Sequence, residues 1–165
     1  MGIWIAVFIT FAVLGSVLWI KPSPREKLLM EYRQLAMAKG LKVRMLDQKL
    51  ATQLFPWIEN YRPYVFYEKN LPVSAKPSSA KPIVVRVSDN PDAHEIDEVD
   101  PVRQAIQSRV GFEKLPNTAE AIVISASGIS VLWREVRVEG KTKETLLEEL
   151  ENYMQLLMKE SDIWT

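Results

Sequence analysis

The stretch AIVISASGISVLW, residues 121–133, sets the architecture of this chain. Ala121–Ser125 is rich in β-branched residues, and so is the run Ile129–Val136, so both are predicted to be strands. Ser127-Gly128 lies between them, where a tight hairpin turn needs the backbone freedom of glycine. The pattern therefore predicts an antiparallel hairpin in the second half of the chain.

Three more strands are predicted before this hairpin. Leu41–Leu46 alternates apolar and basic residues, Tyr64–Tyr67 is aromatic, and Ile83–Val87 is almost continuously β-branched, which favours a central place in a sheet. Residues 71–82, LPVSAKPSSAKP, are rich in Pro, Ser and Ala and are expected to form an exposed loop. The loop is long enough to join two of these strands as a hairpin.

Helices are predicted on both sides of the strands. Ser23-Pro24 with Glu26 has the features of a helix start, and this helix should run to Lys39, before Gly40. A short helix is expected after Asp100, and a long one with a broad apolar face ends the chain. The fold class is therefore predicted to be α+β, with a largely antiparallel sheet of about five strands, flanked by an N-terminal helix and a long C-terminal helix.

Residues 2–20, GIWIAVFITFAVLGSVLWI, form an apolar stretch without a charged residue. As a helix with a rise of ~1.5 Å per residue it covers about 28 Å, close to the hydrocarbon thickness of a bilayer. It lacks the basic start and the cleavage site of a signal peptide. We therefore predict a single transmembrane anchor over residues 1–21 and one domain over 22–165, with membrane-interface residues Trp4, Trp19, Lys21, Arg25 and Lys27.

The charges after the anchor predict its direction. Residues 21–50 carry eight Lys and Arg against three acids, and no Lys or Arg precedes the apolar stretch. The positive-inside rule then places the domain in the cytoplasm, with the anchor in the cell inner membrane. An anchored domain that faces the periplasm is the alternative.

The composition of the whole chain limits its partners. The chain has 21 Lys and Arg, 21 Asp and Glu, and no Cys, so it lacks both a strong basic excess and disulfides. We expect the lipid bilayer and a protein as partners, and no nucleic acid. The C-terminal helix, which ends in Ile163-Trp164, is expected to pack on its own sheet, and the interface of a homodimer is the alternative.

The acidic segment DNPDAHEIDEVD, residues 89–100, is the first candidate site, with hard oxygen and imidazole ligands at Asp92, His94, Glu95 and Asp97. It departs from the calcium-loop pattern, because Pro91 occupies the third position and no glycine stands at the sixth. We therefore expect a solvated loop and no bound metal. A metal site and the docking of a basic partner are the alternatives.

A dense aromatic segment is the second candidate. Trp57, Tyr61 and Tyr64 could form a partner surface, since Trp and Tyr dominate contact energies at interfaces. We nevertheless favour packing in the core for this segment, with the tyrosine hydroxyls exposed. Core packing is also predicted for Trp133 and for the methionines, which are expected to fill gaps: Met37, Met45, Met154 and Met158.

No catalytic motif stands out in the sequence. A glycine-rich phosphate loop, a nucleophile elbow and a paired-histidine metal motif are all missing. We therefore expect no cofactor and interpret the chain as a single-pass membrane-anchored accessory or protein-interaction module. A membrane-tethered enzyme with a site assembled from scattered polar residues is the alternative.

Overall fold

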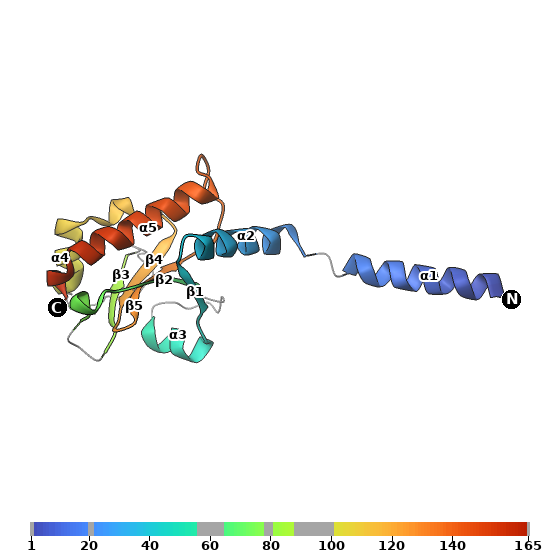
Figure 1. The fold of residues 1–165 in the computed structure, drawn as a ribbon, viewed down its shortest axis with the longest axis horizontal. Coiled ribbons are helices and arrows are strands. Elements are labelled where there is room, and N and C mark those ends of the chain that lie inside the picture. Colours follow the sequence, from blue (N-terminus) through green and yellow to red (C-terminus); the bar gives the residue numbers. More distant parts are fainter. Residues whose placement is uncertain (1, 20–21, 56–64, 78–80, 88–100, 165) are drawn as a thin grey trace. The chain divides into compact units, whose positions relative to one another are not determined.

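The computed structural model describes residues 2–19, 22–55, 65–77, 81–87 and 101–164, except for the side chains of 13–19, Gln48 and Ala75. These residues form two units, Met1–Glu31 and Tyr32–Thr165. The first unit is helical, whereas the second contains the sheet (Figure 1).

The first unit contains helix α1, Gly2–Trp19, and the start of helix α2, Pro24–Ala38. The start of α2 is a capping box, in which each partner satisfies a free backbone amide of the other. The amide of Ser23 donates to the carboxylate of Glu26 at 2.6 Å, and the amide of Glu26 donates to the hydroxyl of Ser23 at 3.2 Å. The predicted start of this helix is confirmed.

The apolar N-terminal stretch is helical, as its composition predicts, but its role as a transmembrane helix is not confirmed. Within the residues that the structure describes, no helix combines the length and the apolar character that are needed to cross a membrane. Helix α1 has 18 residues. A rise of ~1.5 Å per residue gives it a length of about 27 Å, slightly less than the ~30 Å of a typical hydrocarbon core.

The second unit is built on a five-stranded sheet in which all neighbouring strands are antiparallel. The strand order is β1-β2-β5-β4-β3. The predicted α+β class and the predicted number of strands are therefore confirmed. The strands are β1 (Lys42–Met45), β2 (Val65–Asn70), β3 (Ile83–Arg86), β4 (Ala119–Ile124) and β5 (Gly128–Trp133).

Two expectations about the strand order are wrong. Strand β3 lies at an edge of the sheet, although its β-branched residues suggested a central place. Residues 71–82 do not join a hairpin either, because β2 pairs with β5 and β3 pairs with β4. The cause is the hairpin of β4 and β5, which lies between β2 and β3 and occupies the centre of the sheet itself.

Gly128 closes the turn of this hairpin and begins strand β5. The amide of Gly128 donates to the carbonyl of Ser125 at 3.1 Å, and the amide of Ser125 donates back at 3.0 Å. A Cβ atom at position 128 would lie only 2.3 Å from the backbone carbonyl oxygen of Lys69 in the neighbouring strand β2. Glycine is therefore needed for the close approach of β2 and β5, whereas the turn does not place Gly128 in the left-handed region that the sequence suggested.

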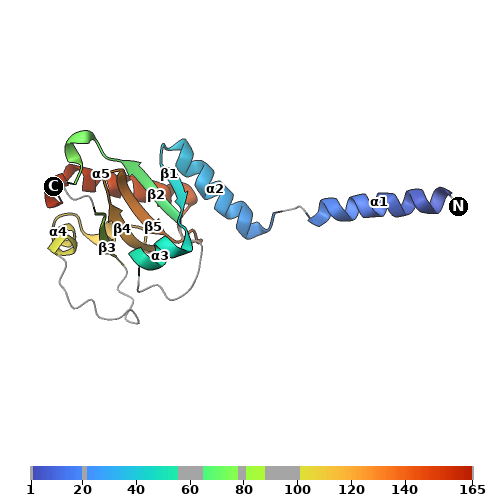
Figure 2. The ribbon, with the colours of Figure 1, turned by 90° about the horizontal axis from the view of Figure 1, so that it is seen from below.

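Helices lie on both faces of the sheet. Helix α3, Gln48–Leu54, and helix α5, Lys143–Lys159, cover opposite faces (Figures 1 and 2). Helix α4, Pro101–Arg109, packs beside the edge strand β3. The predicted flanking helices are confirmed.

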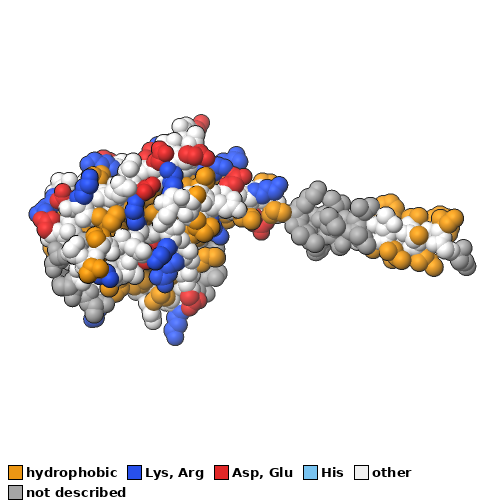
Figure 3. All heavy atoms as spheres, in the orientation of Figure 1, with side chains coloured by type: hydrophobic (Ala, Val, Ile, Leu, Met, Phe, Trp, Pro, Cys, Tyr) orange, Lys and Arg blue, Asp and Glu red, His pale blue; other side chains and the backbone are white. Residues whose placement is uncertain are grey.

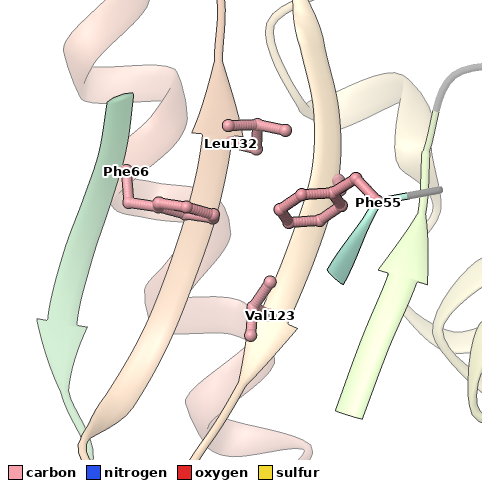
Figure 4. Close-up of a cluster of buried hydrophobic side chains, with 5 residues drawn as sticks. Phe55, Phe66, Val123 and Leu132 are labelled. Atoms are coloured by element: carbon pink, nitrogen blue, oxygen red, sulfur yellow. The ribbon is translucent and has the colours of Figure 1, made fainter. Parts of the chain in front are cut away.

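Each face of the sheet has its own apolar core. Beside α3, the rings of Phe55 and Phe66 lie 5.8 Å apart over Val123 and Leu132 of the two central strands (Figure 4). Helix α5 contributes six buried side chains on its side: Leu146, Leu147, Leu150, Tyr153, Met154 and Leu157. The second unit therefore buries its apolar residues on both faces of one sheet.

The predicted roles of the methionines are only partly correct. Met154 is buried in the core as expected, but Met37 and Met45 are exposed. Met45 is the last residue of an edge strand, where no strand described by the structure covers its outer side. Trp133, by contrast, is buried as predicted.

Candidate functional site

A buried carboxylate is the centre of the first polar cluster in the second unit. Glu135 follows strand β5, and its side chain is only 4% exposed. Its Oε1 atom accepts hydrogen bonds from Arg33 Nε at 3.1 Å and from the Tyr67 hydroxyl at 2.6 Å. Its Oε2 atom accepts from the second Arg33 nitrogen at 2.9 Å. The carboxylate is thus fully compensated by one cation and one hydroxyl.

Aromatic rings surround this cluster. The ring of Trp133 contacts those of Tyr32 and Tyr67 edge to face, with centroid distances of 5.2 and 5.1 Å. Burial raises the pKa of the Tyr67 hydroxyl, and its hydrogen bond to Glu135 raises that pKa further. The same carboxylate raises the pKa of Arg33. Tyr67 therefore remains a neutral donor and Arg33 a cation over the whole physiological pH range.

This cluster fastens helix α2 to the sheet. Arg33 lies in α2, Tyr67 in β2, and Glu135 just after β5, so three separate parts of the chain meet at one carboxylate. The hydroxyl of Tyr32, also in α2, donates to the carbonyl of Val136 at 3.3 Å. Both oxygens of Glu135 are already occupied by these donors. The arrangement suits a structural fastening better than a catalytic base, because the side chain is buried and three of its acceptor positions are already used.

The second polar cluster lies at the β1 edge of the sheet. Glu68 of β2 is buried, and it forms an ion pair with Arg44 of β1 at 3.3 Å. Lys42, at the start of β1, donates to the side-chain carbonyl of Asn70 at 2.9 Å. Figure 3 shows Lys and Arg side chains among hydrophobic ones over β1 and α3. The cations of this cluster, Lys42 and Arg44, are exposed, whereas Arg33, the cation that pairs with Glu135, is half-buried.

The candidate ligands and partner residues from the sequence fall outside the described residues. This applies to Asp92, His94, Glu95 and Asp97 of the acidic segment, and to Trp57, Tyr61 and Tyr64 of the aromatic segment. Among the residues that are described, no group of three or more His, Cys, Asp or Glu side chains could hold a metal ion.

The predicted membrane-interface residues are described only in part. Trp4 in α1 is 78% exposed, and Arg25 and Lys27 in the first turns of α2 are exposed as well. Lys21 and the side chain of Trp19 lie outside the part of the chain that the structure describes.

Sequence reasoning missed both buried carboxylates, although a signal for one of them existed. Position 135 has the same parity as Val131 and Trp133, so the alternation of a strand places Glu135 on the same face as these two buried side chains. A carboxylate at an inward position needs a cation or hydroxyl partner. Its partners could not be predicted, because Arg33 is 102 residues away in the sequence.

Comparisons with known proteins find no matching family model, no matching curated protein and no matching solved structure. The candidate function therefore depends on the residues of this chain alone.

Proposed function

We propose that this protein is a single-pass membrane-anchored module whose second unit binds another protein. In this proposal α1 is the anchor in the cell inner membrane, and residues 22–165 form a cytoplasmic domain. The module acts as an accessory to its partner.

The exposure of α1 is the observation that carries this proposal. Its large side chains from Ile3 to Phe11 are all exposed, with Phe8 at 76%, and Figure 3 shows several hydrophobic side chains on the face of this helix that is in view. Positions 3, 4, 5, 7, 8, 9 and 11 point in all directions around a helix with 3.6 residues per turn. A helix that is apolar all round belongs in a protein core or in a membrane.

The sequence of the anchor and its flanks supports the orientation. Residues 2–20 contain no charge, and the eight Lys and Arg in residues 21–50 outnumber three acids. Such a basic flank remains on the cytoplasmic side. Near an anionic leaflet each of these cations adds ~1 kcal/mol of attraction.

The nature of the polar clusters supports binding rather than catalysis. The Glu135 carboxylate is buried and already accepts three hydrogen bonds from Arg33 and Tyr67, which suits a structural role. Lys42 and Arg44 at the β1 edge are exposed, and they suit contact with an acidic partner.

Reporter fusions in bacterial cells test the anchor and its direction. Green fluorescent protein at the C-terminus should fluoresce at the cell membrane, and alkaline phosphatase at the same position should be inactive. Deletion of residues 1–20 should release the fluorescence into the soluble fraction. A dark fluorescent fusion with an active phosphatase would contradict the orientation, and fluorescence that is soluble with α1 present would contradict the anchor.

A further inference from the structure

The two edges of the sheet differ in exposure. The strand order places β1 at one edge and β3 at the other. In β1 three of the four side chains are exposed, and Met45 reaches 63%. In β3 none of the four is exposed, and Val85 is completely buried. Within the described ranges no strand pairs with the outer side of β1, and its side chains are more exposed than those of β3, so we take β1 as the more accessible edge.

An accessible edge strand offers backbone groups to a partner. Alternate N–H and C=O groups of β1 point away from β2, and in water they are ready to pair with an added strand. Main-chain hydrogen bonds of this kind provide affinity in peptide recognition by strand addition, and the alternating side chains provide specificity.

The side chains of β1 define a chemical pattern for such a partner. Lys42 and Arg44 lie on one face of the sheet, and Val43 and Met45 lie on the other. Arg44 is already paired with the buried Glu68, whereas among the described residues Lys42 donates to the neutral side-chain amide of Asn70. The edge is therefore basic on one face and apolar on the other.

We propose that the β1 edge binds an extended segment of a partner protein in which acidic and apolar residues alternate. The segment adds a sixth strand beside β1, with its acids opposite Lys42 and Arg44 and its apolar residues opposite Val43 and Met45. Directly opposite residues lie about 4.5–5.5 Å apart between Cβ atoms, and opposite charges at this distance stabilise the pairing. The proposal rests on the proposed role as an interaction module and does not depend on the anchor.

Two other occupants fit this edge less well. If a second copy pairs its β1 antiparallel around Val43, Lys42 of one copy lies opposite Arg44 of the other, and like charges in this position repel. Cations on edge strands are a common device against such self-pairing. A lipid surface provides phosphates for the cations, but it cannot form a ladder with the backbone groups of the strand.

Binding of a labelled peptide to the full chain in detergent micelles tests the charge pattern. The peptide Glu-Val-Glu-Val-Glu should bind saturably by fluorescence anisotropy, and Lys-Val-Lys-Val-Lys should not. Lys42→Glu turns one attraction into a repulsion and should weaken binding at least roughly fivefold. Lys81→Glu is the matched control, because Lys81 is exposed and lies two residues before the other edge strand, β3. It should change binding less than twofold.

N-methylated peptides test the backbone ladder without any change to the protein. An added strand directs alternate amides toward β1 and the others toward solvent. Methylation of one alternate set should therefore abolish binding, and methylation of the other set should be tolerated.

Four results would overturn the proposal: no saturable binding, equal binding of both methylated peptides, an unchanged affinity of Lys42→Glu, or self-association of the full chain through β1 by light scattering. Any of these results leaves the membrane association untouched, so failure of the docking site and failure of the anchor are distinguishable.

Discussion

Phenylalanine has opposite surroundings in two parts of this protein. In strand β2, Phe66 is 4% exposed and packs against Phe55 and Leu132, whereas in helix α1 Phe8 is 76% exposed. The second unit provides the apolar environment for its own side chains, but α1 exposes the same kinds of side chain. We propose that a bilayer provides the apolar environment of α1.

The largest effect is expected from removing the same ring in both places. Phe66→Ala should lower the free energy of unfolding of the second unit by about 3–5 kcal/mol, because it opens a cavity in a packed core. Phe8→Ala should leave that free energy unchanged. Chemical unfolding of the full chain in detergent, followed by circular dichroism, measures both. Equal losses in the two variants would mean that α1 belongs to the same cooperative core.

A charge placed at one exposed apolar position in α1 and at another in the second unit sharpens the comparison between these two regions. Ile9→Arg introduces a cation into the middle of α1, which costs ~2.5–3.5 kcal/mol at the centre of a membrane helix. The membrane-bound to soluble ratio of the protein should fall roughly 100-fold. Val73→Arg is the control, since Val73 is 85% exposed in the second unit. A ratio that changes equally in both variants would contradict the proposed anchor.

The Glu135 cluster should contribute a smaller amount of stability. Glu135→Gln removes the charge that holds Arg33 and should cost about 1–3 kcal/mol of unfolding free energy. The cost is expected near the low end, because the Arg33 side chain is 27% exposed and water can replace part of the interaction. Glu139→Gln is the matched control at an exposed position four residues later.

A double-mutant cycle then separates the cluster from general effects of the substitution. Glu135→Gln combined with Tyr67→Phe should cost less than the sum of the two single changes, because the first weakens and the second removes the same hydrogen bond. Additive costs would show that Glu135 and Tyr67 do not stabilise α2 as a unit.

The smallest expected effect is a pH dependence from the surface of α5. Lys69 donates to Glu151 at 2.8 Å, and this bond lowers the pKa of Glu151 below its ordinary value of 4.5. A lowered pKa in the folded state adds stability above the ordinary value, and this stability is lost as the pH falls through the folded value. Glu151→Gln should therefore flatten the loss of stability between about pH 5 and 3 by less than ~1 kcal/mol. An unchanged acid profile would contradict the ion pair.

Local features of the fold could be predicted from the sequence, because they depend on neighbouring residues. The capping box of Ser23 and Glu26 and the hairpin around Gly128 are both present in the structure. The strand order could not be predicted in this way. The β-branched residues of β3 indicate a buried strand, but they do not show that α4 rather than another strand packs beside it.

The candidate sites were harder to predict from the sequence than the strand order, because they depend on contacts between residues far apart in the chain. Lys42 and Arg44 were recognised as basic positions of a strand, but the place of that strand at the accessible edge follows only from its pairing with β2. The partners of Glu135 were missed because α2, β2 and the end of β5 come together only in the folded chain.

The depth of α1 in a bilayer is the most direct test of the proposed anchor. The chain has no cysteine, so Phe8→Cys gives a single site for a nitroxide spin label in the full protein in lipid nanodiscs. We expect a label at position 8 to be relaxed by oxygen, which concentrates in the hydrocarbon, and to be shielded from a water-soluble nickel complex. A label at position 73 should show the reverse. Equal access of the nickel complex to both labels would contradict the account.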